Sequence, residues 1–468
     1  MLIKQHDNTT KLAQCRWASI YLVMSLIAAL SSCFGNLCPA VYGLPMAVYI
    51  TGLITQPQAR TTSIAESIGL VSHDQLSRML RALGWSISSG AICVVKFIEL
   101  LGITGGYLII DDVLIPKPFA ALIAFCGWDW DHSRHYNVFG QRLVFVVWCN
   151  GYLIIPLLFA FWQKDPNKPR KRKKRSRGRP RKRGRRITDY SAKARARRRE
   201  YRCKRKAKLR RKRLPTGVHY RTKNELARVL LWKLVRAGIK CEFILFDNWY
   251  ASEDNLALFE RLGLYWVTRA KENAKVYYDN ERLMVKEVAN TVEKQNYHYY
   301  DALKARVRSF QVTLVDRLVK LTVIKDDTAP ESGRTKYLMT NALHLTNQEH
   351  IWWYRLRWSI EVFFRDIKQH LNLTSCEARS EEVIIAHVVL VCIAYTFMQL
   401  LKPLASQQRP SIGSTIKTIV PLVVAADSRQ FARPNPSGSL QVVSFDHLVL
   451  AFRTRFSNLP YPENPLLT

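Results

Sequence analysis

The spacing of apolar and polar residues predicts a chain that changes from helices to a mixed sheet near residue 105. Residues 1–100 have mainly helical periodicity. The first β-type runs are Tyr107–Ile110, Arg142–Trp148 and Tyr152–Trp162. Helix and strand patterns then alternate over Asn224–Ala237, Cys241–Phe246, Ser252–Leu262 and Leu264–Thr268. Strands in antiparallel succession, followed by strands that alternate with helices, predict a mixed α/β sheet.

The later part of the chain returns to β patterning before it ends in helices. Residues 274–340 contain three strand-like runs and are interpreted as a β-rich insertion. A long helix is predicted from about Thr346 to beyond Lys368, followed by the apolar run Val383–Leu401. The predicted domains are 1–100, helical and DNA-binding; 101–165, 216–273 and 341–403, three parts of one core; 166–215, a basic insertion; 274–340, the β-rich insertion; and 404–468, a C-terminal tail.

Two apolar runs, Ala18–Gly35 and Val383–Leu401, reach the lower edge of membrane-spanning length. The first contains Leu30-Ser31-Ser32-Cys33, which resembles a lipoprotein cleavage box, but its charged start is longer than that of a usual signal peptide. We therefore favour buried helices over a membrane anchor. The ten cysteines are scattered without a CxxC pair, which indicates reduced intracellular thiols. The expected location is the cytoplasm, in association with the nucleoid.

Positive charge is concentrated in one segment of the chain. The 468 residues carry a formal net charge of +36, and Lys164–Arg213 contributes 29 basic against 3 acidic residues. So strong an excess predicts a polyanionic partner, with DNA as the first candidate. Within the segment, Arg177-Gly178-Arg179-Pro180 resembles the core of an AT-hook, whose arginines enter the minor groove of A·T-rich DNA. A tract that binds phosphates without reading sequence explains the same residues equally well.

Residues Thr62–Leu83 have the pattern of a helix-turn-helix. A helical run is followed by Gly69, the N-cap residue Ser72 and a second helix that carries Arg78 and Arg81. An ordinary pair of antiparallel helices fits this pattern as well.

Four polar residues share one stripe of the long helix predicted after Thr346. At about 100° per residue, Tyr354, Arg357, Glu361 and Lys368 fall within a stripe roughly 60° wide, beside an apolar face. Arg357 and Glu361 alone fit a simple surface ion pair. The stripe instead offers one carboxylate and three groups that bind phosphates, which is typical of a nucleic-acid-processing site.

The spacing Tyr354-x2-Arg357-x3-Glu361-x6-Lys368 resembles the Y-R-E-K signature of DDE transposases from bacterial insertion sequences, of the insertion-sequence-four type. The resemblance runs from about Tyr107 to Leu401 and is strongest in Tyr354–Leu371 and Phe246–Ser252. It is weaker in Leu108–Lys117, where Val113 stands in place of the usual Thr. Asp112 is the residue that aligns as catalytic, and Asp111 is the alternative, because neighbours on a strand point to opposite faces.

This resemblance implies a ribonuclease H-like fold whose catalytic and metal-binding residues are Asp112, Asp247 and Glu361. Hard carboxylate oxygens suit Mg²⁺ or Mn²⁺, and two ions are expected to clamp the attacking and leaving oxygens of a phosphodiester. Tyr354, Arg357 and Lys368 are expected to bind backbone phosphates. The expected function is binding of inverted-repeat DNA ends by a homodimer, hydrolysis, and transfer of the 3′-hydroxyl ends into target DNA. The alternatives are a non-catalytic DNA-binding regulator derived from a transposase and a membrane-anchored basic protein.

Several other residues are weaker candidates. Arg269 and Lys271 follow a predicted strand and are expected to contact phosphates. Tyrosines of the β-rich insertion either stack on an unpaired base or form cross-strand pairs, and we prefer the cross-strand interpretation; they are Tyr297, Tyr299 and Tyr300. A cluster in a predicted hairpin loop has metal-ligand chemistry but is interpreted as surface polar groups; it comprises Asp129, Asp131, His132 and His135.

Deletion of residues 168–213 tests the role of the basic segment. Each Lys or Arg that binds a phosphate releases counterions, so the deletion should flatten the dependence of DNA affinity on salt concentration. Binding isotherms between about 50 and 200 mM salt measure this slope. An unaltered slope would show that the segment does not contact DNA.

Overall fold

The computed structural model describes residues 42–83, 105–118, 122–131, 134–165, 200, 220–326, 335–402 and 411–417. The described helices are α2 (Gly43–Thr55), α3 (Thr61–Ile68), α4 (His73–Ala82), α7 (Lys223–Arg236), α8 (Glu253–Arg261), α9 (Val285–Val288), α10 (Asn347–Leu356), α11 (Trp358–Gln369) and α12 (Glu381–Leu401). The strands are β1 (Tyr107–Pro116), β2 (Cys126–Asp131), β3 (Tyr136–Cys149), β4 (Ile154–Trp162), β5 (Phe243–Phe246), β6 (Tyr265–Arg269), β7 (Lys275–Tyr278), β8 (Glu281–Met284), β9 (His298–Tyr300), β10 (Ala305–Leu314), β11 (Arg317–Asp326) and β12 (Thr335–Thr340).

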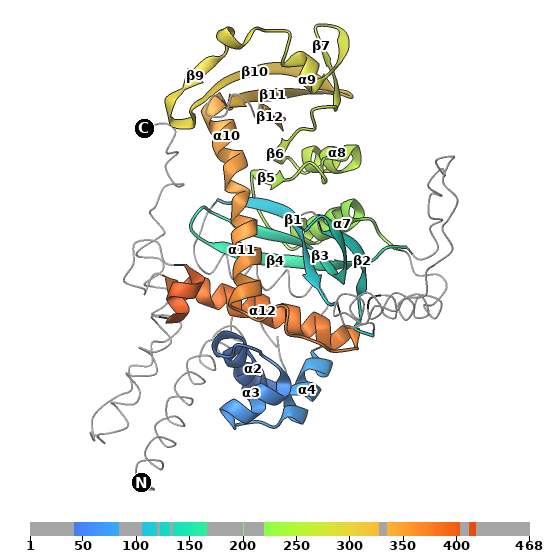
Figure 1. Ribbon diagram of the computed structural model, residues 1–468, viewed down its shortest axis with the longest axis vertical. Coiled ribbons are helices and arrows are strands. Elements are labelled where there is room, and N and C mark those ends of the chain that lie inside the picture. Colours follow the sequence, from blue (N-terminus) through green and yellow to red (C-terminus); the bar gives the residue numbers. More distant parts are fainter. Residues whose placement is uncertain are drawn as a thin grey trace, which may run out of the picture.

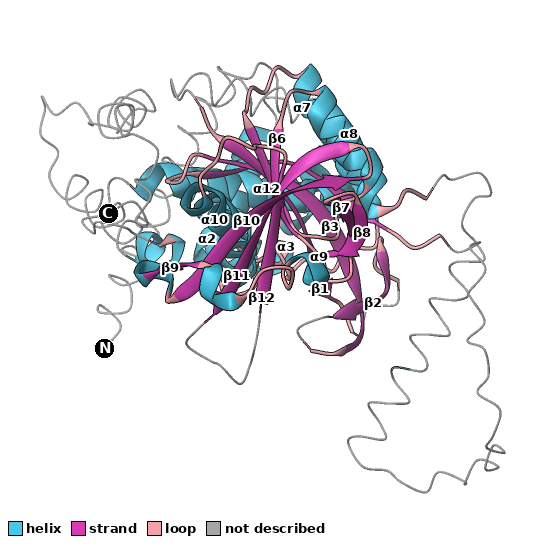
Figure 2. Ribbon diagram, turned by 90° about the horizontal axis from the view of Figure 1, so that it is seen from above, coloured by secondary structure: helices cyan, strands magenta, loops and turns pink. Residues whose placement is uncertain are grey.

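These strands form one sheet in the order β2-β3-β1-β5-β6-β12-β11-β10-β7-β8, with β4 paired to β3 and β9 to β10. The strand β5 runs parallel to β1 and to β6, whereas the other pairs are antiparallel. Figure 2 shows the strands fanned out by the twist of the sheet. The predicted mixed α/β sheet is confirmed, and its arrangement is consistent with a ribonuclease H-like fold.

Helices cover both faces of the central strands. On one face, Trp353 of α10 stacks on Phe243 at 4.0 Å between ring centroids, and Phe363 of α11 packs against Phe145 at 5.4 Å. On the other face, Phe259 of α8 packs against Phe246 at 5.2 Å. Figure 1 shows α10 and α11 running one after the other along the sheet, with α12 crossing below them.

This arrangement sets the directions of the two aspartates in β1. Asp111 lies opposite Phe145 in the antiparallel ladder with β3, so it faces α11. Asp112 lies opposite Val144 and faces the side that α7 and α8 cover. The two carboxylates therefore belong to different environments, although they are adjacent in the chain.

The helix α12 lies in the interior of the protein. Within the described residues it is the segment long and apolar enough to cross a membrane, but 67% of its most apolar window is buried. It packs on α2, α4 and β4, and the Tyr49 hydroxyl forms a 2.9 Å hydrogen bond with Nδ1 of His387. Its burial supports the interpretation of Val383–Leu401 as a core helix. The run Ala18–Gly35 lies outside the described residues.

The two helices predicted in Thr62–Leu83 are observed as α3 and α4. Gly69 ends α3 in the left-handed conformation with φ of 74°, where glycine has no steric penalty. Ser72 caps α4 by accepting from the backbone N–H of Gln75. Arg78 and Arg81 are exposed on α4, and DNA binding by this pair of helices stays a prediction.

Two features differ from the sequence interpretation. The long helix predicted from Thr346 is interrupted at Arg357, where Arg357 N–H bonds to Tyr354 O and Ile360 N–H to Arg357 O, both three residues apart. These tighter bonds break the α-helical ladder and separate α10 from α11. In addition, Asp129 and Asp131 lie on the strand β2 and not in a hairpin loop.

The described residues of 274–340 are β-rich, as predicted, and that they form an insertion stays a prediction. Tyr297 is buried and donates its hydroxyl to Ala289 O at 2.7 Å, while Tyr299 and Tyr300 pair with Arg306 and Ala305 across the β9–β10 ladder. The contacts of these tyrosines therefore agree with the structural interpretation. The domain boundaries themselves stay predictions.

Asn372 joins the N-terminal helices to the end of α11. Its backbone is left-handed, with φ of 57°. Its Nδ2 donates to Leu53 O at 3.0 Å and to Gln56 O at 2.8 Å, and its Oδ1 accepts from Ala59 N–H at 3.2 Å.

We expect Asn372→Gly to lower the free energy of unfolding by about 2–3 kcal/mol, because it keeps the left-handed backbone and removes three hydrogen bonds. Urea denaturation measures the change. Asn280 has φ of 63° and lies in the β7–β8 turn, so Asn280→Gly is the matched control and should stay within about 0.5 kcal/mol. Equal effects of the two substitutions would contradict this role of the Asn372 side chain.

Candidate active site

Asp111 and Asp247 lie side by side where the parallel pairing of β1 with β5 ends. Ile110 in β1 is the register partner of Phe246 in β5, and each is followed directly by one of these aspartates. Neighbouring strands lie about 4.8 Å apart, and parallel strands end at the same edge of a sheet. Two residues far apart in the chain are thus brought to the same level of the sheet.

The two carboxylates have raised pKa values. Burial, and then the charges of Asp247 and Asp112, raise the pKa of Asp111 to about 7. Burial also raises the pKa of Asp247, although the 2.9 Å hydrogen bond from the Trp249 N–H to its Oδ1 opposes this shift. Two buried acids that repel each other form a site that favours a cation.

Arg357 links Asp111 to Glu361. Its Nη1 lies 3.1 Å from Asp111 Oδ2, and its Nη2 lies 2.5 Å from Glu361 Oε1. The break between α10 and α11 falls at this residue, and both acids are partly buried. The Nε atom of Arg357 is buried and has no hydrogen-bond partner within the described chain. The guanidinium therefore holds the third carboxylate close to the pair and keeps one donor unused.

Asp112 lies on the opposite face in a buried network of ion pairs. Its Oδ1 accepts from Lys223 Nζ and from the Tyr250 hydroxyl, each at 2.9 Å, and its Oδ2 pairs with Arg142. Burial alone would raise the pKa of Asp112, but the charges of Lys223 and Arg142 outweigh it and lower the pKa. Both oxygens of Asp112 are thus occupied by protein donors.

The network continues from Asp112 to the strand β2. Arg142 also pairs with Asp129 and donates to Trp130 O at 3.0 Å, and Lys164 Nζ lies 3.1 Å from Asp129 Oδ1. Asp129 is therefore bound to cations of the protein, which agrees with its interpretation as a polar group and not a metal ligand. His132 lies outside the described residues, and His135 sits in the turn before β3.

Tyr354, Arg357 and Glu361 stay neighbours across the interruption, because the Arg357 guanidinium lies 5.8 Å from the centroid of the Tyr354 ring and contacts Glu361. Lys368 lies near Asp131, Arg142 and Arg134, and burial is the main cause that lowers its pKa. Tyr354 also lines a cavity together with residues of β10–β12.

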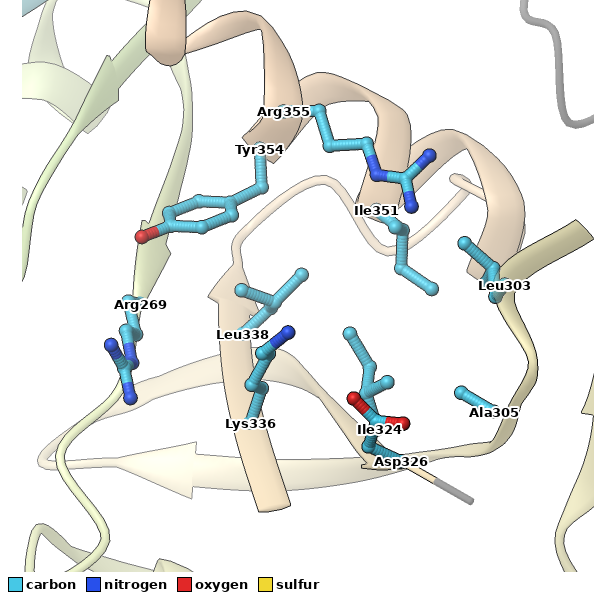
Figure 3. Close-up of a pocket in the computed structure, with 10 residues that line it drawn as sticks. All are labelled: Arg269, Leu303, Ala305, Ile324, Asp326, Lys336, Leu338, Ile351, Tyr354 and Arg355. Atoms are coloured by element: carbon cyan, nitrogen blue, oxygen red, sulfur yellow. The ribbon is translucent and has the colours of Figure 1, made fainter. Parts of the chain in front are cut away.

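Tyr354 and Arg269 line a cavity of about 270 Å³ between α10 and the strands β10–β12. Figure 3 shows the two side chains near each other, with Lys336 and Arg355 also at this cavity. Lys271 follows β6 and is exposed. The AT-hook-like residues Arg177 and Arg179 lie outside the described residues.

The donor set of this site suits a hard divalent cation in part. Asp111 and Asp247 supply carboxylate oxygens of the kind that Mg²⁺ prefers, and their mutual repulsion would be relieved by a cation between them. Within the described chain no three His, Cys, Asp or Glu side chains are close enough together to hold a metal ion. Glu361 lies next to Asp111 through Arg357, which contacts both carboxylates.

Arg142, Lys223 and Tyr250 were not singled out from the sequence. Arg142 carries the clearest signal in retrospect, because it is a charged residue at the start of the apolar run Leu143–Trp148. A charge beside a buried strand requires a buried partner. The sequence does not reveal which acid supplies it.

Comparison with known proteins supports a transposase. Residues 176–397 match the family described as Transposase DDE domain. This span contains Asp247, Arg357 and Glu361 and begins after β1. A search of the curated proteins gave no match. The family match therefore supports a DDE transposase with a DNA substrate, and it reaches two of the three carboxylates.

The raised pKa of Asp111 predicts how stability depends on pH in the absence of metal. The folded protein holds this proton up to about pH 7, whereas the unfolded chain loses it near pH 4. The free energy of unfolding should therefore fall as the pH rises from about 4 to about 7, and this loss is complete above the folded pKa.

Between pH 5 and pH 8, we expect the free energy of unfolding of Asp111→Asn to fall by on the order of 2 kcal/mol less than that of the wild-type protein. Urea denaturation in the presence of a chelator at both pH values measures the two free energies. Asp316 is exposed, so Asp316→Asn should keep the wild-type dependence. If Asp111→Asn also keeps it, the assignment of a buried, raised pKa to Asp111 is wrong.

Proposed function

We propose that the protein is a metal-dependent DNA transposase of the Y-R-E-K, insertion-sequence-four type. It binds inverted-repeat ends, hydrolyses the phosphodiester bonds there and transfers the 3′-hydroxyl ends into target DNA. The observation that carries this proposal is the pair of partly buried acids in matching register, Asp111 and Asp247, with Glu361 joined to Asp111 through Arg357. The family match over residues 176–397 supports the same class of enzyme.

The proposed catalytic and metal-binding residues are Asp111, Asp247 and Glu361. Sequence alignment favoured Asp112, but three contacts argue for its neighbour. Asp111 shares the register and the face of Asp247 and contacts the arginine that binds Glu361, whereas Asp112 is paired with Arg142 and Lys223 on the other face. Asp112 would have to leave both cations to bind a metal, and breaking a buried ion pair is costly.

Two divalent cations, Mg²⁺ or Mn²⁺, are expected at these acids, where they would activate the attacking oxygen and stabilise the leaving oxygen of the phosphodiester. Asp111 must be ionised to bind a cation, so its carboxyl oxygen gives up the proton that it holds below about pH 7. The buried strands β1 and β5 fix the positions of Asp111 and Asp247 before DNA arrives. Positioning by rigid strands lowers the cost of assembling the site.

Arg357 has two successive partners in this proposal. Without DNA it holds Asp111 and Glu361. A guanidinium binds phosphate through two parallel hydrogen bonds, and its Nε is already free of other partners within the described chain. The DNA backbone is therefore expected to take Arg357 from the acids and so release Glu361. Tyr354, Lys368, Arg269 and Lys271 are proposed to bind other phosphates.

The remaining parts of the chain are proposed to hold the DNA. The helices α3 and α4 and the basic segment with Arg177 and Arg179 would bind element ends, and a homodimer would bring two ends together. A chain with this function acts in the cytoplasm at the nucleoid and needs no membrane. Short inverted repeats on either side of the coding sequence would support the proposal further.

The decisive experiment measures cleavage of labelled DNA ends with Mg²⁺ in four variants. Asp111→Asn, Asp247→Asn and Glu361→Gln should each lower the cleavage rate by at least about 10³-fold while DNA binding persists. Asp112→Asn is the matched control. It should lower the free energy of unfolding by about 3 kcal/mol, because Arg142 and Lys223 lose their partner, and keep cleavage by the folded molecules.

Two outcomes would count against the proposal. If Asp112→Asn abolishes cleavage in folded protein and Asp111→Asn does not, the alignment and not the geometry identifies the catalytic residue. If the wild-type protein binds the ends but never cleaves them with either metal, the chain is a non-catalytic regulator derived from a transposase.

A further inference from the structure

Aromatic and cationic side chains alternate on the surface beside Asp112. The Lys223 ammonium lies 4.3 Å from the ring centroid of Trp249 and 5.9 Å from that of Trp162. The Lys164 ammonium lies 5.5 Å from the centroid of the same Trp162 ring. We call these four residues, Trp249, Lys223, Trp162 and Lys164, the tryptophan platform.

The platform is fixed to the candidate active site through Trp249, and Lys223 anchors it to Asp112 on the other face of β1. The backbone N–H of Trp249 donates to Asp247 Oδ1 at 2.9 Å, so the indole belongs to the turn that carries this acid. Lys223 Nζ bonds to Asp112, the neighbour of Asp111 in β1, at 2.9 Å. A DNA strand with a phosphate at Asp111 and Asp247 would therefore have its next nucleotides at Trp249.

Trp249 is an exposed tryptophan whose backbone contacts the candidate active site. Trp148 and Trp266 are fully buried in the core, whereas Trp249 is 51% exposed and Trp162 is half-buried. Large exposed aromatic groups beside a site generally mark a binding surface. Cations that lie over the rings exclude an apolar partner and favour one that carries negative charge and flat faces.

The sequence supplies a second argument for DNA. Residues 166–219 connect Lys164 to the region of Lys223, and they contain 28 Lys and Arg against 2 Asp and Glu. The most basic stretch of the chain thus begins and ends beside the platform. This positive charge attracts a polyanion. DNA carries far more negative charge than a small acidic protein surface, so it is the favoured partner of the platform.

We propose that the tryptophan platform binds unpaired nucleotides of the DNA strand next to the bond that is cut. This inference rests on the proposed function. The bases stack on Trp249 and Trp162, and their phosphates contact Lys164, whose side chain is 47% exposed, while Lys223 stays paired with Asp112. Only unpaired bases present their faces to an indole, because in a duplex neighbouring base pairs cover them. Stacking of this kind tolerates any base, so the platform holds the strand without reading its sequence.

The test measures binding without cleavage. Fluorescence anisotropy of the full chain in a chelator, at about 200 mM salt to limit binding by the basic segment, compares a 15-nucleotide oligo-dT with a 15-base-pair duplex. Trp249→Ala should weaken binding of oligo-dT by about 5- to 100-fold and binding of the duplex by less than about 2-fold. Trp249→Phe should recover most of the affinity, because a phenyl ring also stacks.

Trp232 provides the matched control. It is 45% exposed on α7, so Trp232→Ala should leave both affinities unchanged. Equal weakening of oligo-dT and duplex by Trp249→Ala would assign the platform to phosphate binding in duplex DNA and overturn the proposal. Unchanged binding of oligo-dT would overturn it as well, and so would wild-type affinity of Trp249→Leu for oligo-dT, because leucine is apolar but cannot stack.

This test is separate from the test of the catalytic acids. If Trp249→Ala loses oligo-dT binding while the acid variants still cleave DNA, the platform stands and the assignment of the acids fails. If the acid variants lose cleavage and Trp249→Ala binds oligo-dT normally, the active site stands and the platform fails.

Discussion

Repulsion between two partly buried carboxylates in matching register is the constraint on which the site depends. The paired residues Tyr107–Ile110 and Phe243–Phe246 are apolar and buried on both faces, which holds the two strands together. A shift of one position would turn one of the two acids to the opposite face of the sheet. The sheet therefore holds two like charges together, and an opposite charge must offset them.

Arg357 supplies that opposite charge in this structure. It lies at the interruption between the helices α10 and α11. The interruption between α10 and α11 places the guanidinium where it reaches both Asp111 and Glu361. On the other face, Arg142 and Lys223 neutralise Asp112 in the same way. Asp111 is thus paired with Arg357, and Asp112 with Arg142 and Lys223. The two sets of ion pairs lie on opposite faces of β1. On the face of Arg357, one guanidinium is shared by two carboxylates, so negative charge is in excess there. This face is therefore the one that favours binding of a further cation.

Much of this arrangement could be predicted from the sequence. The position of Asp247 after an apolar strand and of Glu361 on a late helix followed from periodicity, and the mixed sheet is as expected. The sequence favoured Asp112 over Asp111. Which of the two carboxylates shares the face of Asp247 depends on the pairing of β1 with β5, a strand more than 130 residues later, and the sequence alone does not show that pairing. The break at Arg357 was missed because Leu356 and Trp358 fit a continuous helix, and angles along a helix assume that it is continuous. The strand β2 did carry a signal, since Trp128 and Trp130 alternate with Asp129 and Asp131.

Binding of Mn²⁺ followed by electron paramagnetic resonance tests the central claim most directly, because it reports on the acids without requiring DNA or turnover. The account predicts that Asp111→Asn and Asp247→Asn each weaken Mn²⁺ binding by about 10-fold or more, whereas folded Asp112→Asn binds it within about 3-fold of the wild-type protein. Loss of Mn²⁺ binding in Asp112→Asn, with normal binding in Asp111→Asn, would contradict the account.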